Sequence, residues 1–91
     1  REPARPPAAH PGTFTVTTPI SGVFYRSPSP RAKAFIEVGA AVTPGQTLCL
    51  VEAMKMMNEI QASARGRVVK ILVENGKPVK AGQDLFMLEP L

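Results

Sequence analysis

The fold of this chain is decided by the stretch Glu52-Ala53-Met54-Lys55-Met56-Met57, which sets one lysine between methionines. On local propensity alone this stretch predicts a helix, because Glu, Ala, Met and Lys lose little side-chain freedom there. Its flanks, residues 48–51 and 58–62, are instead short and include β-branched residues, as strands do. We therefore expect residues 53–56 to form the tip of a β-hairpin that holds Lys55 out in solvent.

The second half of the chain repeats the pattern of the first half. Residues 37–52 align with residues 74–89 at an offset of 37 positions, with seven identities. The identical pairs are Glu37/Glu74, Gly39/Gly76, Val42/Val79, Gly45/Gly82, Gln46/Gln83, Leu48/Leu85 and Glu52/Glu89. Two similar halves predict two similar sets of strands about a pseudo-two-fold axis, each covering the apolar face of the other. We expect an all-β fold, a flattened sandwich or barrel of two four-stranded sheets, with the lysine hairpin and the chain termini at opposite ends.

Further strands and turns follow from alternation and from turn residues. Strands are expected within residues 13–18, 19–25, 67–73 and 85–88. Gly22 predicts a tight bend in the second of these strands. Asn75-Gly76 predicts a turn of the type that closes hairpins.

The first repeat contains an insertion. Gly22 and Gly66 have similar turn contexts but lie 44 positions apart rather than 37, so about seven extra residues must lie around residues 26–34. This segment contains Pro28 and Pro30, which exclude a central strand. An ordinary surface loop and a Ser-Pro phosphorylation site are both compatible with the segment.

Composition limits the function classes. The 91 residues predict one small domain, and the start at Arg1 indicates a fragment or a processed form. The Pro- and Ala-rich residues 1–12 are compatible with a linker and equally with a disordered tail. Cys49, His10 and Asp84 are each the only residue of their type, so nucleophilic triads and Cys-rich metal sites lack their parts. We expect Cys49 to be a buried apolar residue and the chain not to be an enzyme by itself.

Charge and hydropathy argue against two kinds of partner. The net charge of +4 is compatible with nucleic-acid binding, but the basic residues are scattered along the chain. The aromatic residues Phe14, Phe24, Phe35 and Phe86 sit in apolar settings that favour a core. No apolar run approaches the ~18 residues of a membrane span. We expect neither a nucleic acid nor a membrane as partner.

The residues around Lys55 resemble a known signature. Residues 52–57 resemble the Ala-Met-Lys-Met motif of biotinyl domains, and residues 19–89 resemble the biotin carboxyl carrier proteins of bacterial and plastid-type acetyl-CoA carboxylases. The resemblance implies the biotinyl/lipoyl hammerhead fold over residues 13–91, with biotin attached covalently to Lys55. It also implies a ligase-recognition motif of Glu52, Ala53, Met54 and Met56. The insertion resembles the protruding "thumb" of that family, formed here by Ser27, Pro28, Ser29, Pro30, Arg31, Ala32, Lys33 and Ala34.

The same resemblance implies a non-catalytic carrier. Such a carrier is loaded by a biotin protein ligase and swings its biotin, bare or carboxylated, between biotin carboxylase and carboxyltransferase to make malonyl-CoA for fatty-acid synthesis. The bacterial cytoplasm is the implied compartment, with the plastid stroma as the alternative, and self-association stays open. Two alternatives remain: a biotinyl domain of another carboxylase or decarboxylase, and a lipoyl carrier, whose family usually has Asp-Lys-Ala where this chain has Met54-Lys55-Met56.

Overall fold

A computed structural model of the protein describes residues 12–91. Within this range the strands are β1 (Phe14–Thr17), β2 (Gly22–Tyr25), β3 (Ala41–Val42), β4 (Thr47–Ala53), β5 (Met56–Gln61), β6 (Gly66–Ile71), β7 (Pro78–Val79) and β8 (Asp84–Pro90). The described residues form no helix, and so none that could cross a membrane. The linker expected over residues 1–12 lies, apart from Gly12, outside the described residues.

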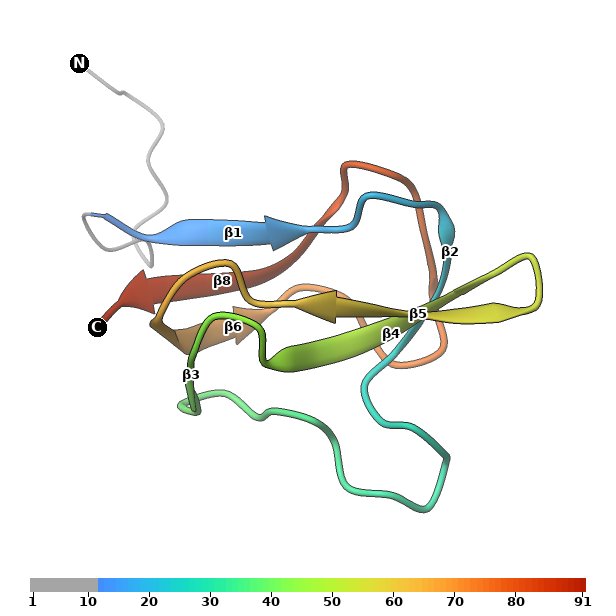
Figure 1. Ribbon diagram of the computed structural model, residues 1–91, viewed down its shortest axis with the longest axis horizontal. Helices are drawn as coiled ribbons and strands as arrows, with labels where there is room; N and C mark the ends of the chain where they lie inside the picture. Colours follow the sequence, from blue (N-terminus) through green and yellow to red (C-terminus); the bar gives the residue numbers. More distant parts are fainter. Residues whose placement is uncertain (1–11) are drawn as a thin grey trace.

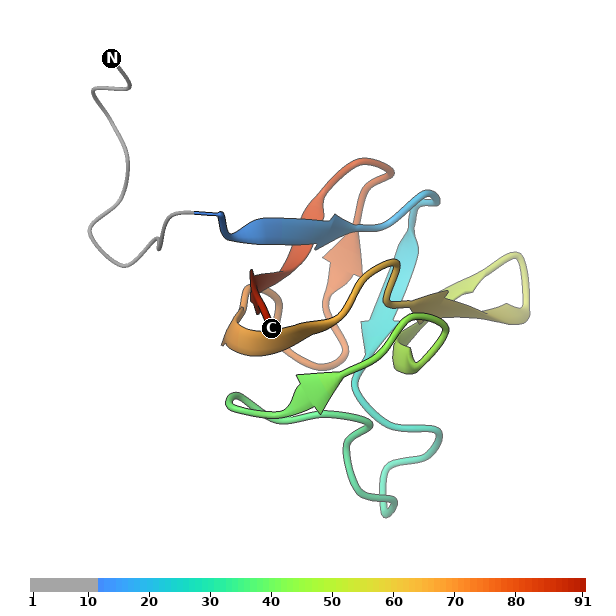
Figure 2. The ribbon, with the colours of Figure 1, turned by 60° about the vertical axis from the view of Figure 1, so that its left-hand side comes forward.

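The strands form two four-stranded sheets, in the orders β1-β8-β6-β3 and β5-β4-β2-β7 (Figures 1 and 2). Every pairing in them is antiparallel. Placing one order on the other matches β1 with β5, β8 with β4, β6 with β2, and β3 with β7. The predicted all-β sandwich of two pseudo-two-fold-related sheets is confirmed.

Matching hydrogen bonds close the two repeats in the same way. The backbone N–H of Gly45 donates to the carbonyl of Ala62 (2.8 Å), and that of Gly82 donates to the carbonyl of Thr18 (2.6 Å). Both glycines have positive φ, 87° and 88°, which a residue with a Cβ atom adopts only with strain. The glycines shared by the two repeats are therefore required by the same turn, made twice.

The core lies between the two sheets. Phe24 of β2 and Phe86 of β8 come from opposite sheets, are fully buried, and place their ring centroids 5.8 Å apart. Phe14 packs against this core, whereas Phe35 is half-buried beside the thumb. The other buried residues of the cluster are Val16, Ile36, Val42, Leu48, Cys49, Val51, Ile60, Ala62, Val68, Val73, Val79, Leu85 and Leu88.

Cys49 is one of these core residues, as expected. It is completely buried in β4, and burial raises the pKa of its thiol to about 12. Because the thiolate is the reactive form, this thiol is inert at neutral pH in the folded chain.

Two features of the fold differ from the sequence-based expectation. β3 and β7 were not placed, because strands of two residues carry no readable alternation. The prediction that Asn75-Gly76 closes a hairpin is wrong, because β6 and β7, which flank it, lie in different sheets. A turn of the hairpin type needs positive φ at both central residues, whereas here only Gly76 has it. The turn instead carries the chain from one sheet to the other.

The tight bend predicted at Gly22 is also wrong. Gly22 lies within β2 opposite Val79, without positive φ. Its missing side chain matters for a different reason, since a Cβ atom there would collide with the backbone oxygen of Glu52 in β4. Gly66 occupies the equivalent place in the second repeat, where a Cβ atom would come within 2.9 Å of the oxygen of Glu89. Both glycines permit close approach of two strands.

Replacing Gly22 with alanine is expected to lower the free energy of unfolding by about 1–3 kcal/mol, because β2 and β4 must move apart to admit the methyl group. Chemical denaturation followed by circular dichroism measures this change. Gly66→Ala is the matched control and is expected to cost less, since its nearest backbone contact is less close. Equal costs for the two variants would contradict this explanation.

Candidate functional site

Lys55 lies at the turn of the β4–β5 hairpin. Ala53 pairs with Met56, so Met54 and Lys55 are the two central residues of the tightest kind of hairpin loop. Their φ angles are 52° and 65°, both in the left-handed region. This is the primed turn that matches the right-handed twist of the flanking strands. The hairpin predicted over residues 53–56 is confirmed, and the helix suggested by local propensity does not form.

The residues at this turn are unusual for its geometry. Turns with two left-handed residues strongly prefer Asn-Gly, because a side chain such as Met or Lys crowds the backbone there. Holding a residue other than glycine in this region costs of order 1–3 kcal/mol, and such strain concentrates at functional sites. Met54 and Lys55 are therefore in a place that folding alone would fill differently. The strained turn is therefore a candidate functional site.

The side chains around the turn are open to solvent. Lys55 is exposed, Met54 is 94% exposed, and Met56 and Met57 are 65% and 48% exposed. Glu52 and Ala53, the last residues of β4, are half-buried. Figure 1 shows the hairpin projecting at the opposite end of the sandwich from the C-terminus and the start of β1, as expected. The methionines do not belong to the core cluster, so their apolar surface is available to another molecule.

The thumb, residues 27–34, leaves the sandwich between β2 and β3 and has no strand or helix (Figures 1 and 2). A short turn shapes its tip: Ser27 Oγ donates to the carbonyl of Ser29 (2.7 Å), and the N–H of Ala32 donates to the same carbonyl (3.1 Å). The expected insertion is thus a protruding loop beside the β4–β5 hairpin.

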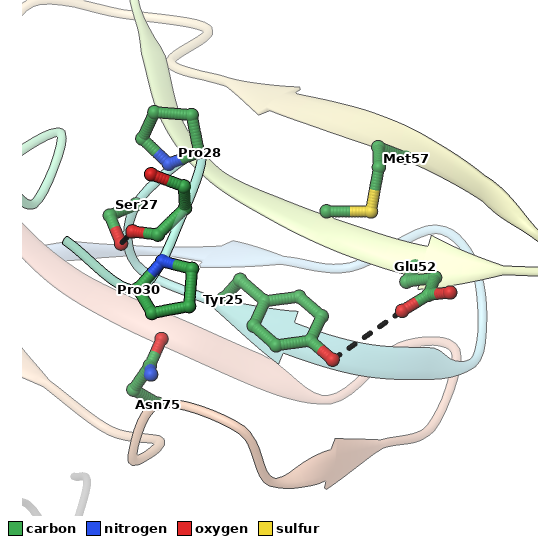
Figure 3. Close-up of a pocket in the computed structure, with 8 residues that line it drawn as sticks. Tyr25, Ser27, Pro28, Pro30, Glu52, Met57 and Asn75 are labelled. Atoms are coloured by element: carbon green, nitrogen blue, oxygen red, sulfur yellow. Dashed lines mark hydrogen bonds between the residues drawn. The ribbon is translucent and has the colours of Figure 1, made fainter. Parts of the chain in front are cut away.

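A pocket of about 290 Å³ opens between the thumb and the hairpin. It is lined by Tyr25, Ser27, Pro28, Ser29, Pro30, Glu52, Met57 and Asn75 (Figure 3). The phenol of Tyr25 donates to Glu52 Oε1 at 3.4 Å and links β2 to β4 on one side of the pocket. The first half of the expected thumb lines this pocket, whereas Arg31, Ala32, Lys33 and Ala34 do not.

Three residues of the pocket are not among the site residues predicted from the sequence. Tyr25 ends β2 just before the insertion, Met57 faces Glu52 across the hairpin, and Asn75 comes from the β6–β7 turn. Asn75 aligns with Val38 of the first repeat, but nine of the sixteen aligned positions differ, so this difference alone did not mark Asn75 as a site residue.

The hairpin, its exposed lysine and the paired sheets agree with one family. A family described as "Biotin-requiring enzyme" matches residues 14–88, which is most of the chain. The chain belongs to this biotin/lipoyl family. The match runs from β1 to β8 and so includes the hairpin, the thumb and both repeats of the biotin/lipoyl domain.

Relatives of this biotin/lipoyl domain carry related names. The chain is 49% identical over 75 residues to the biotin carboxyl carrier protein of acetyl-CoA carboxylase from Nostoc sp., covering 82% of this chain and 41% of the relative. It is 53% identical to a chloroplastic counterpart from Arabidopsis thaliana, covering 84% of this chain and 27% of the relative. It is also 53% identical to the protein of that name from Haemophilus influenzae, covering 81% and 48%. The chain thus spans less than half the length of these relatives.

Solved structures share the fold. A single-chain, multi-domain long-chain acyl-CoA carboxylase matches 91% of this chain with a TM-score of 0.77 and 25% identity, over 8% of its own length. The urea carboxylase of Kluyveromyces lactis matches 84% of this chain with a TM-score of 0.69 and 28% identity, over 6% of its length. In both cases the biotin/lipoyl domain corresponds to a small part of a much larger carboxylase.

Proposed function

We propose that this chain contains the biotin carrier domain of an acetyl-CoA carboxylase, with biotin attached to Lys55. The observation that carries the proposal is the lysine at a strained two-residue turn, exposed between two exposed methionines. The names of the relatives, at about half of the residues identical, supply the enzyme class. The proposal divides the chain into a linker over residues 1–12 and a carrier domain over residues 13–91, with the thumb at residues 27–34.

Attachment needs a second protein. An exposed lysine amine is mostly protonated at neutral pH and is a poor nucleophile without help. A biotin protein ligase removes the proton and presents the acyl group as an adenylate, so that an amide forms on Lys55 Nζ and AMP leaves. The ligase recognises a surface formed by Glu52, Ala53, Met54 and Met56, because exposed methionine side chains adapt to a partner at little cost. The modification removes one positive charge.

The pocket beside the hairpin fits the group that Lys55 would carry. The lysine stem and the valeryl chain together contain about ten single bonds of ~1.5 Å, which gives a reach on the order of 10–15 Å. Glu52, at the edge of the pocket, lies three residues back along the strand from Lys55, or about 10 Å at ~3.4 Å per residue. The attached ring therefore reaches the pocket when the arm folds back, and Ser27, Pro28 and Tyr25 provide the surface it meets.

The domain itself contributes presentation. Biotin, when bound, supplies a ureido nitrogen that carries a carboxyl group between two active sites. The hairpin projects from the end of the sandwich opposite to the start of β1 and the C-terminus, so neither of these lies beside the tip that partners approach. A biotin carboxylase and a carboxyltransferase are the proposed partners, in the bacterial cytoplasm or the plastid stroma. A tether raises their encounter rate through an effective concentration in the millimolar range.

A biotinyl domain of a different carboxylase is the second candidate. The two solved carboxylases that share the fold favour it. Their sequence identities to this chain, 25% and 28%, are well below those of the acetyl-CoA carboxylase carriers. The acetyl-CoA carboxylase is therefore the preferred enzyme.

Incubating the chain with biotin, ATP and a biotin protein ligase is expected to add one biotinyl group, located on the peptide that contains Lys55. Intact-mass and peptide mass spectrometry measure this step. The product, given a bacterial biotin carboxylase, ATP and labelled bicarbonate, is expected to acquire the label. Modification by a lipoate ligase instead of the biotin ligase would overturn the proposal in favour of a lipoyl carrier.

A further inference from the structure

We propose that Asn75, on the β6–β7 turn of the second repeat, is the positioning residue that holds the thumb over the pocket. This inference rests on the proposed function for its consequence, the retention of an attached group, but its structural part concerns the unmodified chain. Asn75 lies far from the thumb in sequence and beside it in the fold, and Figure 3 shows it below Pro30.

The contact that carries the inference is a side-chain hydrogen bond between repeats. Asn75 Oδ1 accepts a hydrogen bond from the backbone N–H of Arg26 at 2.8 Å, across 49 positions of sequence. Arg26 is the residue at which the chain leaves β2 to enter the thumb. The hydrogen bond therefore fixes the start of the loop to a turn that belongs to the other half of the molecule.

Arg26 also forms hydrogen bonds with the residues that follow the end of the thumb. Its carbonyl accepts from the N–H of Phe35 at 2.8 Å, just after the thumb ends. Its guanidinium Nη2 donates to the carbonyl of Ile36 (3.0 Å) and pairs with Glu37 Oε1 (2.8 Å). Both arms of the thumb are thus joined at Arg26, and Asn75 ties the joined base to the β6–β7 turn.

The internal symmetry separates this role from general turn formation. The position equivalent to Asn75 is Val38, which is 60% exposed, and the position equivalent to Arg26 is Lys70, which is also exposed. The turn glycines Gly39 and Gly76 are the same in both repeats, and their N–H groups donate equivalent hydrogen bonds of 2.7 Å. The turn therefore forms without the asparagine. The two repeats differ in the residue before the turn glycine, and only the second repeat has the asparagine that supports the thumb.

A consequence follows for the attached group. Pro28 and Pro30 stiffen the thumb but cannot donate backbone hydrogen bonds, so the loop depends on its base for position. Asn75 itself lines the pocket, next to the thumb. If the base is released, the thumb moves away and the pocket no longer holds the ring between transfers.

Asn75→Ala tests the inference in two ways. In the unmodified chain, amide hydrogen exchange at Phe35, whose N–H donates to the carbonyl of Arg26, is expected to become about fivefold faster, which corresponds to the loss of one hydrogen bond of about 1 kcal/mol. In the biotinylated chain, capture of the attached biotin by avidin is expected to accelerate by a comparable factor. Asn75→Asp keeps an acceptor oxygen at the same place and is expected to restore both rates.

Val38→Ala is the matched control, because it changes the equivalent turn of the first repeat, and it is expected to leave both rates unchanged. Unchanged exchange in Asn75→Ala, or an equal increase in Val38→Ala, would overturn the inference. A chain that accepts no biotin would defeat the proposed function alone, since the exchange measurement does not need the modification.

Discussion

Replacing Lys55 with arginine is expected to abolish biotin attachment completely. Arginine keeps the positive charge and the length of the side chain, but its guanidinium stays protonated and forms no amide with an acyl-adenylate. The remaining lysines of the described chain do not stand at a two-residue turn between exposed methionines. A streptavidin blot after ligation measures the loss, and intact mass gives the modified fraction.

A second variant separates the lost amine from a lost fold. Lys55→Gly is also expected to accept no biotin, yet to raise the free energy of unfolding by about 1 kcal/mol, because glycine adopts the left-handed conformation without strain. A protein that becomes more stable while losing its modification cannot have lost it through misfolding. Biotin found on another lysine in either variant would contradict the assignment of Lys55.

Replacing Phe86 with alanine is expected to lower the free energy of unfolding by about 3–5 kcal/mol. The ring is fully buried, it meets Phe24 from the opposite sheet, and its removal leaves a cavity at the centre of the sandwich. Because proteins are stable by only about 5–15 kcal/mol, this loss is a large fraction of the total free energy of unfolding. Urea denaturation followed by circular dichroism gives the change.

Phe35→Ala is the control for this experiment. Phe35 is half-buried beside the thumb and outside the core cluster, so its removal is expected to cost much less. Similar costs for the two variants would show that the core does not lie where the two sheets meet.

The hairpin and the symmetry were predictable from the sequence because both leave local signs. A short apolar run before Lys55 and an alternating run after it each indicate a strand, and a repeat of identical glycines at one offset implies one turn made twice. Positive φ at Gly45 and Gly82 explains why those positions coincide in the two repeats. The role of Gly22 had no such local sign. This glycine is needed because β4, which is distant in sequence, comes close to it.

The pocket was not predictable from the sequence in the same way. It combines residues from β2, the thumb, the β4–β5 hairpin and the β6–β7 turn, and of these only Glu52 and the thumb residues are predicted as site residues from the sequence. The dipeptide Asn75-Gly76 predicts a hairpin because it is typical of hairpin turns. In the structure it instead joins β6 to β7, which lie in different sheets.

By itself, then, the sequence determined that this protein is a twofold-repeated β domain that presents one lysine at the tip of a hairpin. Periodicity, turn residues and charge are local properties, and they report which side of a strand is buried and where the chain reverses. Only the tertiary structure decided which strands are neighbours, which glycine faces a backbone oxygen, and that Asn75 supports a loop 49 positions away. Such contacts depend on how the two sheets are stacked, and no local pattern of residues records that arrangement.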